Sequence, residues 1–196
     1  MRLLVGPDGR LRCGWALGAP EYLYYHDHEW GQPVTSVSGL YERLSLEAFQ
    51  AGLAWITILR KRESFRAAFA GFQPDRVARF GPADVERLMQ DEGIVRNRAK
   101  IEATIANARV VDGLGEDFAR LILAHAVRDR PRPTEGTVPA TSPESVAMAA
   151  ALKAAGIRFV GPTTAYALMQ AVGLVDDHLD GCFVPPHWRG GEQQRR

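Results

Sequence analysis

Cysteine, long apolar runs and an excess of charge of either sign are all scarce in this 196-residue chain. The first ten residues, MRLLVGPDGR, hold no apolar core of the kind a secretory signal needs, and no later apolar run is long enough to span a membrane. The sequence therefore predicts a cytoplasmic protein without a membrane segment. A net charge of +1 excludes the strongly basic surface of a bulk nucleic-acid binder, so any nucleic-acid surface must be a local patch.

Strand-like alternation of apolar and polar residues is also missing, and helical spacing takes its place. With 46% hydrophobic residues, the chain can bury one good core. The predicted fold is all-α, with a single domain over 12–188, an N-terminal extension over 1–11 and a C-terminal tail over 189–196. Helices are expected over 39–72, 74–80, 82–92, 99–110, 118–123, 144–155 and 162–172.

Residues that carry chemistry gather in the stretch 12–31, RCGWALGAPEYLYYHDHEWG. Glycine and proline interrupt it, and aromatic rings with polar atoms fill it, which is typical of the floor of a site rather than of a plain core segment. Cysteines and histidines from this stretch and from the far end of the chain form the Cys2His2 set of a closed structural zinc site: Cys13, His26, His178 and Cys182. The alternative is two unrelated thiols and two ordinary histidines, because the spacing of Cys13 and His26 is not that of a zinc finger.

Two residues of the predicted helix 39–72 suit a flat ligand. Glu47 and Trp55 lie two turns apart, broadly on one side of that helix. An indole can stack on a nucleobase while a carboxylate accepts a hydrogen bond from the exocyclic amine of the base. Taken alone, Glu47 is better explained as a solvated surface acid and Trp55 as core. The aromatic residues beside the candidate zinc ligands favour a site.

A glycine-bearing turn over 156–164, GIRFVGPTT, joins two predicted helices. Backbone N–H groups at such a turn, and at the start of the helix that follows, suit a phosphate group. Gly161, Thr163 and Thr164 would present them to DNA, with Arg158 nearby. An ordinary connection between helices is the alternative, and for a lone glycine turn it is the better one.

Collinear motifs over most of the chain resemble those of the DNA-3-methyladenine glycosylase I family. The resemblance implies an all-α, helix-hairpin-helix fold with one structural zinc ion. It further implies a monomeric enzyme, with no protein partner, that acts on double-stranded DNA containing alkylated bases. Such an enzyme flips out and hydrolytically excises 3-methyladenine, which leaves an abasic site. The motifs are RCGW (12–15), YHD and EWG (25–31), LE and QAGLAW (46–55), KRE (61–63), GI (93–94), KI (100–101), FVGPT (159–163), MQA (169–171), and DH and GC (177–182).

The resemblance also implies roles for individual residues. It assigns recognition of the base to Glu47 and Tyr25, and stacking on the base to Trp55. Further implied roles are pocket walls at Trp15, Tyr22 and Trp30, contacts near the gap left by the extruded nucleotide at Gly52 and Leu53, and zinc ligation at Cys13, His26, His178 and Cys182. The chain departs from the family at 1–11 and 190–196, which have no counterpart, and at 118–129, which lacks an expected tryptophan.

Catalysis by this family needs no acid to protonate the leaving group, because a base alkylated at N3 already carries a positive charge. Asp176 and Asp177 follow the turn where other members of the superfamily keep an aspartate, but the resemblance implies that this family does not use one. Asp177 is as well explained as the partner of a zinc-bound His178 imidazole. Two alternatives stay open: a non-catalytic, zinc-stabilised helix-hairpin-helix DNA-binding module, and a glycosylase of the same fold for other damage. The intact pocket residues argue against the first.

Overall fold

The computed structural model describes residues 1–128, 130–134, 136 and 138–186. Within these ranges the chain is mostly helical, as the sequence predicts. The predicted C-terminal tail, 189–196, lies outside the described residues, as does the very end of the predicted domain. None of the described helices is both long enough and apolar enough to cross a membrane.

The helices follow one another with short connections, and several begin with proline at the first helical position, where its missing N–H is not needed. The predicted helix starts at residues 74, 82 and 162 fall on these prolines and are confirmed, and the start predicted at 144 lies one residue after Pro143. In chain order the helices are η1 (Gly14–Gly18), α1 (Pro20–His28), α2 (Val37–Gln50), α3 (Trp55–Ala68), η2 (Ala70–Phe72), α4 (Pro74–Val77), α5 (Pro82–Gln90), α6 (Arg98–Leu114), α7 (Glu116–Leu123), α8 (Pro143–Ala154) and α9 (Pro162–Ala171).

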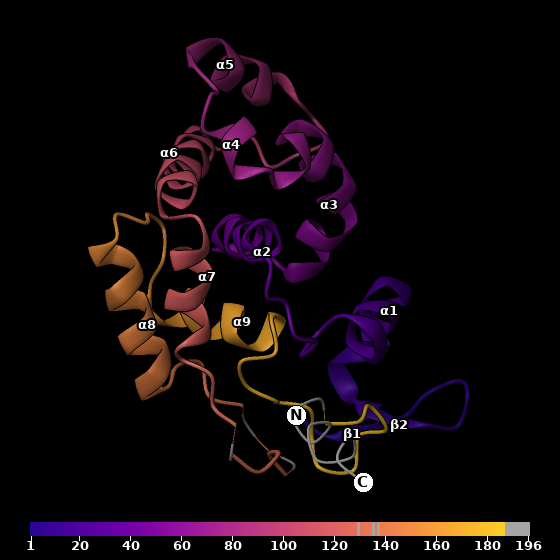
Figure 1. The fold of residues 1–196 in the computed structure, drawn as a ribbon. Coiled ribbons are helices and arrows are strands. Elements are labelled where there is room, and N and C mark those ends of the chain that lie inside the picture. The colour runs from indigo at the N-terminus through magenta and orange to yellow at the C-terminus, as the bar shows by residue number, and fades with distance from the viewer. Residues whose placement is uncertain (129, 135, 137, 187–196) are drawn as a thin grey trace, which may run out of the picture.

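Helix α2 lies in the middle of the molecule, in contact with α3, α6, α7 and α9 (Figure 1). Ser36 caps its first turn, since its side chain accepts a hydrogen bond from the Gly39 N–H. Leu40, Leu44 and Phe49 on this helix are fully buried in the main core. A helix enclosed on several sides places even its polar residues inside the protein.

One long helix over 39–72 was predicted, and this is wrong. Helix α2 ends at Gln50 and α3 begins at Trp55. Between them Gly52 has a φ of +84°, in the left-handed region that favours glycine and that an α-helix does not use. The chain therefore turns a corner, and Glu47 and Trp55 lie on two different helices rather than on one side of the same helix.

The structure has a short β-hairpin near the N-terminus, which the predicted all-α fold did not include. Strands β1 (Leu3–Val5) and β2 (Leu11–Cys13) pair antiparallel, so the predicted boundary between residues 11 and 12 falls inside β2. Each strand has three residues, too few to show an alternating pattern. The segment around Phe183 lies against this hairpin at the base of the molecule, where the Phe183 N–H donates to the Leu11 carbonyl at 2.9 Å (Figure 1).

The glycine-bearing turn predicted over 156–164 joins α8 to α9, which pack against each other. Gly156 has a φ of +96°, as expected for a glycine that ends a helix. The side chain of Asn107, on α6, binds both backbone polar groups of Arg158 in the turn: it donates to the Arg158 carbonyl at 3.1 Å and accepts from the Arg158 N–H at 2.8 Å. The turn is thus fixed to the body of the protein.

Candidate functional site

A cavity of about 350 Å³ opens between α1, α2, the start of α3 and α9. Its volume falls in the range of small-molecule sites, roughly 300–1,000 Å³. The structure brings all six predicted pocket residues together around it. The lining consists of Met1, Trp15, Tyr22, Tyr25, Trp30, Glu47, Gln50, Trp55, Val138, Ala167 and Gln170.

Aromatic rings packed edge to face form one side of this cavity. The Trp15 ring centroid lies 5.1 Å from that of Trp30 and 5.7 Å from that of Tyr22, both nearly perpendicular to it. The Tyr25 and Trp55 centroids are 5.4 Å apart at 51°. Rings that hold one another in this way present a rigid apolar wall, which can receive a flat, aromatic ligand.

Tyr22 also positions the start of α3. Its hydroxyl accepts from the Ile56 N–H at 3.0 Å, one of the donors that the first turn of a helix leaves without a helical partner. Ala54, at the N-cap, has no side chain that could do this. Tyr22 therefore couples the aromatic wall on α1 to Trp55, the first residue of α3.

Glu47 is the acidic group of the cavity, and only 7% of it is exposed. The surface position that the sequence favoured for this residue taken alone is therefore wrong. Burial raises the pKa of Glu47 to about 8, against a smaller opposing effect of the Arg43 charge one helical turn away. The pKa of Tyr25 is also raised, by burial and by the nearby Glu47. Near neutral pH the cavity thus holds a largely protonated acid, which a bound cation would convert to the carboxylate.

The Arg43 charge acts on Glu47 only weakly, because it is shared with two other carboxylates. Arg43 pairs with Glu29 and with Glu42, both at 3.2 Å. Glu29 is also bound by Arg62 from α3, which donates to it at 2.8 Å. This network crosslinks the end of α1 to α2 and α3 and keeps the cationic groups paired outside the cavity.

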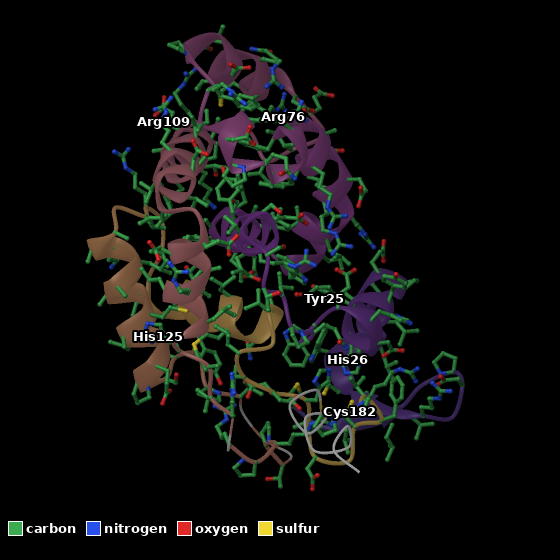
Figure 2. The ribbon with its side chains drawn as sticks, viewed as in Figure 1. Tyr25, His26, Arg76, Arg109, His125 and Cys182 are labelled. Carbon is green, nitrogen blue, oxygen red and sulfur yellow. The ribbon has the colours of Figure 1, made fainter. Side chains whose placement is uncertain are left out.

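The two cysteines and two of the histidines meet at the base of the molecule. The ligand atoms of Cys13, His26 and Cys182 all lie within 4.8 Å of one another, and all three residues are buried. The His178 ring centroid is 5.0 Å from that of His26, and no described residue offers a partner to its buried Nε2. Figure 2 shows Tyr25, His26 and Cys182 following one another down this side of the molecule.

The Cys13 and Cys182 thiols contact each other directly. The pKa of Cys182 lies well below its ordinary value, because its sulfur accepts hydrogen bonds from the Cys13 thiol and from His26. The pKa of Cys13 is correspondingly raised by the same contact and by burial. Two buried thiols beside imidazole nitrogen atoms are a typical donor set for zinc.

Carboxylates orient both imidazole rings. His26 Nδ1 is 2.8 Å from Asp27, and His178 Nδ1 is 2.9 Å from Asp176, so the Nε2 atoms of both rings are left to act as ligands. The partner of His178 is therefore Asp176, and the suggestion that Asp177 fills this role is wrong. Arginine residues hold both carboxylates in turn: Arg12 on Asp27 and Arg132 on Asp176, each at 2.8 Å.

Asp177 is fully buried and faces away from the cluster of Cys13, His26, His178 and Cys182. It forms a salt bridge with Arg130 and accepts hydrogen bonds at 2.7 Å from the Tyr166 hydroxyl and from the amide of Gln170. All of these partners are protein groups. Asp177 thus acts on the cavity only through Gln170, which lines it.

The predicted DNA-contacting residues lie on two exposed connections. Gly52 and Leu53 belong to the corner between α2 and α3, and Leu53 is 41% exposed. The residues on either side of this corner, Gln50 and Trp55, both line the cavity, so the corner borders its opening. Lys100 braces the corner from α6 by donating to two backbone carbonyls, of Phe49 at 2.9 Å and of Ala51 at 2.6 Å.

The second connection is the turn between α8 and α9. Gly161 caps α9, Thr163 is exposed, and Thr164 is partly buried. A Cβ added at Gly161 would meet nothing within 4 Å, and its φ of −116° is open to any residue. The structure therefore leaves space for a ligand directly at the N-terminus of α9.

Residues 15–185 match the family described as methyladenine glycosylase, and the chain belongs to this family. It is 46% identical to DNA-3-methyladenine glycosylase 1 of Escherichia coli K12 over 182 residues, which cover 89% of the chain and 97% of that relative.

Two solved structures are similar throughout. One shows 3-methyladenine DNA glycosylase I from Staphylococcus aureus, at 34% identity, a TM-score of 0.81 and coverage of 90% of this chain and 97% of that one. The other shows a tyrosine-to-phenylalanine variant of a 3-methyladenine DNA glycosylase I in complex with 3-methyladenine, at 33% identity, a TM-score of 0.80 and coverage of 89% and 97%.

Several cavity residues escaped the prediction, since they are brought in from distant segments and carry no distinctive chemistry. Gln50 and Gln170 are the exceptions, because they stand in the QAGLAW and MQA motifs that the family resemblance includes. The others are Met1, Val138 and Ala167.

Proposed function

We propose that the chain is a DNA-3-methyladenine glycosylase, which hydrolyses the N-glycosidic bond of 3-methyladenine in alkylated DNA and leaves an abasic site. The observation that carries the proposal is a buried acid, Glu47, in an aromatic cavity of the size of a nucleobase site, in a chain that belongs to the methyladenine glycosylase family. The glycosylase names of its relatives support the same activity.

The cavity would select a cationic base. The faces of Trp55 and Tyr25 attract positive charge through their quadrupoles, and Glu47 becomes a carboxylate partner when a cation enters. In the reaction, a water oxygen bonds to C1′ of the sugar while the bond from C1′ to N9 breaks. The bonding pair passes to N9 and neutralises the base, and the water loses a proton to solvent. Because the leaving group is already activated by its charge, the protein has to extrude, select and hold the nucleotide.

Cys13, His26, His178 and Cys182 would hold one zinc ion. Support comes from the chemistry of the donor set and from the buried Nε2 of His178, which otherwise lacks a partner in the described part of the chain. The protein fills all four ligand positions, so the ion would supply a structural crosslink between the two ends of the domain and no site for a reactive water.

Double-stranded DNA would lie across the two exposed connections, with α8, the turn and α9 acting as a helix-hairpin-helix. Backbone N–H groups at Gly161 and at Thr163 and Thr164 suit a phosphate, and the open space at Gly161 supports this placement. Leu53, exposed at the corner beside the cavity opening, suits the gap left by an extruded nucleotide. The monomeric state and the cytoplasmic location stay predictions of the sequence.

Release of free bases from methylated duplex DNA, resolved by chromatography, tests the proposal. The expected product is 3-methyladenine, with a Glu47→Gln variant markedly slower. A protein that binds the duplex and releases no base would instead be a DNA-binding module. Release of a different base as the main product would indicate another damage specificity.

A further inference from the structure

Gln170 reaches the cavity from α9 with its amide held in one orientation. Its Nε2 donates to Asp177 Oδ2 at 2.7 Å, and the residue lines the cavity together with Glu47 and Trp55. A carboxylate oxygen only accepts hydrogen bonds, so the nitrogen end of the amide must face Asp177. The oxygen end is then the polar atom that Gln170 offers to a ligand.

Asp177 cannot easily turn to release this amide. Its other oxygen, Oδ1, is bound by Arg130, and its Oδ2 also accepts from the Tyr166 hydroxyl at 2.7 Å. Arg130 donates to that same hydroxyl at 3.0 Å, which closes the network. The side chain of Asp177 is fully buried, so no solvent competes for these bonds. The Gln170 amide is thereby held in one orientation, with its oxygen as the acceptor on the cavity side.

This fixed orientation affects which purine the cavity prefers to bind. Adenine carries an amine at C6, which donates, whereas guanine carries a carbonyl at the same position, which accepts. The charge of Glu47 alone does not discriminate between them, because either purine carries a positive charge when it is methylated at N3 and attracts the carboxylate. A fixed amide oxygen accepts only, so it would favour the amine and oppose the carbonyl.

We propose that Gln170, oriented by Asp177, determines the preference of this site for 3-methyladenine over 3-methylguanine by accepting a hydrogen bond from the exocyclic amine. This inference rests on the proposed glycosylase function. Gln170 makes the contact with the base, and Asp177 acts as a positioning residue behind it.

The first test is Gln170→Met, which keeps the length and unbranched shape of the side chain and removes its polar end. Single-turnover release of 3-methyladenine and of 3-methylguanine is measured on the same methylated duplex. We expect the ratio of the two rates to fall by about tenfold, the effect of losing one favourable pairing and one acceptor conflict in a buried site. Gln50→Met, the same change at another residue of the cavity lining, is expected to leave the ratio unchanged.

The second test is Asp177→Asn, which should reverse the orientation of the Gln170 amide. Arg130 keeps an oxygen at the Oδ1 position, so the new amide nitrogen takes the place of Oδ2 and faces Gln170. The Gln170 amide should then turn and present its nitrogen to the cavity, which favours a carbonyl. The ratio should shift toward 3-methylguanine at least as far as in Gln170→Met. Thermal melts identify an unfolded variant, in which case Gln170→Met decides alone.

The outcomes distinguish the proposed glycosylase function from the proposed role of Gln170. Wild-type protein that releases no 3-methyladenine contradicts the proposed function. Wild-type protein that is active, with Gln170→Met lowering both rates by the same factor, overturns the inference and leaves the function intact.

Discussion

Replacing Glu47 by glutamine should make the protein more stable and less active at the same time. An acid in an apolar cavity resists ionisation, and an amide of nearly the same shape has no charge to bury. The pKa of Glu47 is raised from 4.5 to about 8, which at about 1.4 kcal/mol per pH unit corresponds to a cost of roughly 3–6 kcal/mol for keeping the ionised group in the folded protein.

The sign of the effect follows from the direction of this shift. Below pH 4.5 Glu47 is protonated in the folded and the unfolded chain, so the cost is absent there. It grows as the pH rises from 4.5, because only the unfolded chain ionises freely, and it is complete above about 8. Wild-type stability therefore loses this contribution with rising pH, while the glutamine variant does not.

Urea denaturation of both proteins at pH 5 and pH 8 measures the difference. The advantage of Glu47→Gln should grow by roughly 2–4 kcal/mol between these pH values. Glu63→Gln provides the control, since the Glu63 side chain is 80% exposed and its loss should not change with pH in this way. On activity, loss of a hydrogen bond to a charged group predicts a reduction of roughly 1–3 kcal/mol in transition-state stabilisation. Identical pH dependence of stability in wild type and Glu47→Gln would refute the reasoning.

Three further outcomes are expected. The kcat/KM of the wild type should rise with pH and level off near pH 8, where Glu47 ionises unaided, and this rise should vanish in Glu47→Gln. Purified protein should contain one zinc ion per chain, and Cys182→Ser should lose the ion and lower Tm by roughly 5–10 °C; zinc-free native protein would contradict this. Gly161→Asp should weaken binding to any duplex by roughly three- to tenfold while free-base binding survives, whereas Gly113→Asp, equally unobstructed and elsewhere on the surface, should not.

The helices were predictable where proline, glycine and apolar spacing act locally. The starts of α4, α5, α8 and α9 follow from proline alone. The corner at Gly52 was not predicted, because a glycine inside an apolar helical pattern looks like a tolerated defect, and only the tertiary structure shows its positive φ. The hairpin of β1 and β2 was missed for a related reason: a three-residue strand is stabilised by its partner and not by its own pattern.

The residue types of the candidate site were predictable, but the ionisation state of Glu47 was not. Cysteine, histidine and tryptophan are rare enough to mark a site from composition, and the family motifs name the same positions. Whether Glu47 is charged depends on how far α3 and α9 enclose α2, which no local pattern encodes. The same holds for Asp176 and Asp177, two neighbours whose roles differ because one faces His178 and the other faces Gln170.

The cluster of Cys13, His26, His178 and Cys182 shares structural elements with the cavity. A structural ion bound there would therefore affect binding of the base. Tyr22, Tyr25 and His26 follow at helical spacing on α1, so one short helix supplies both a ligand atom and two cavity walls. Trp30 lines the cavity, and its ring centroid lies 4.7 Å from the ring centroid of His178. An ion that fixes His26 and His178 would therefore also fix the rings that receive the base, so its loss should weaken free-base affinity before the rest of the fold gives way.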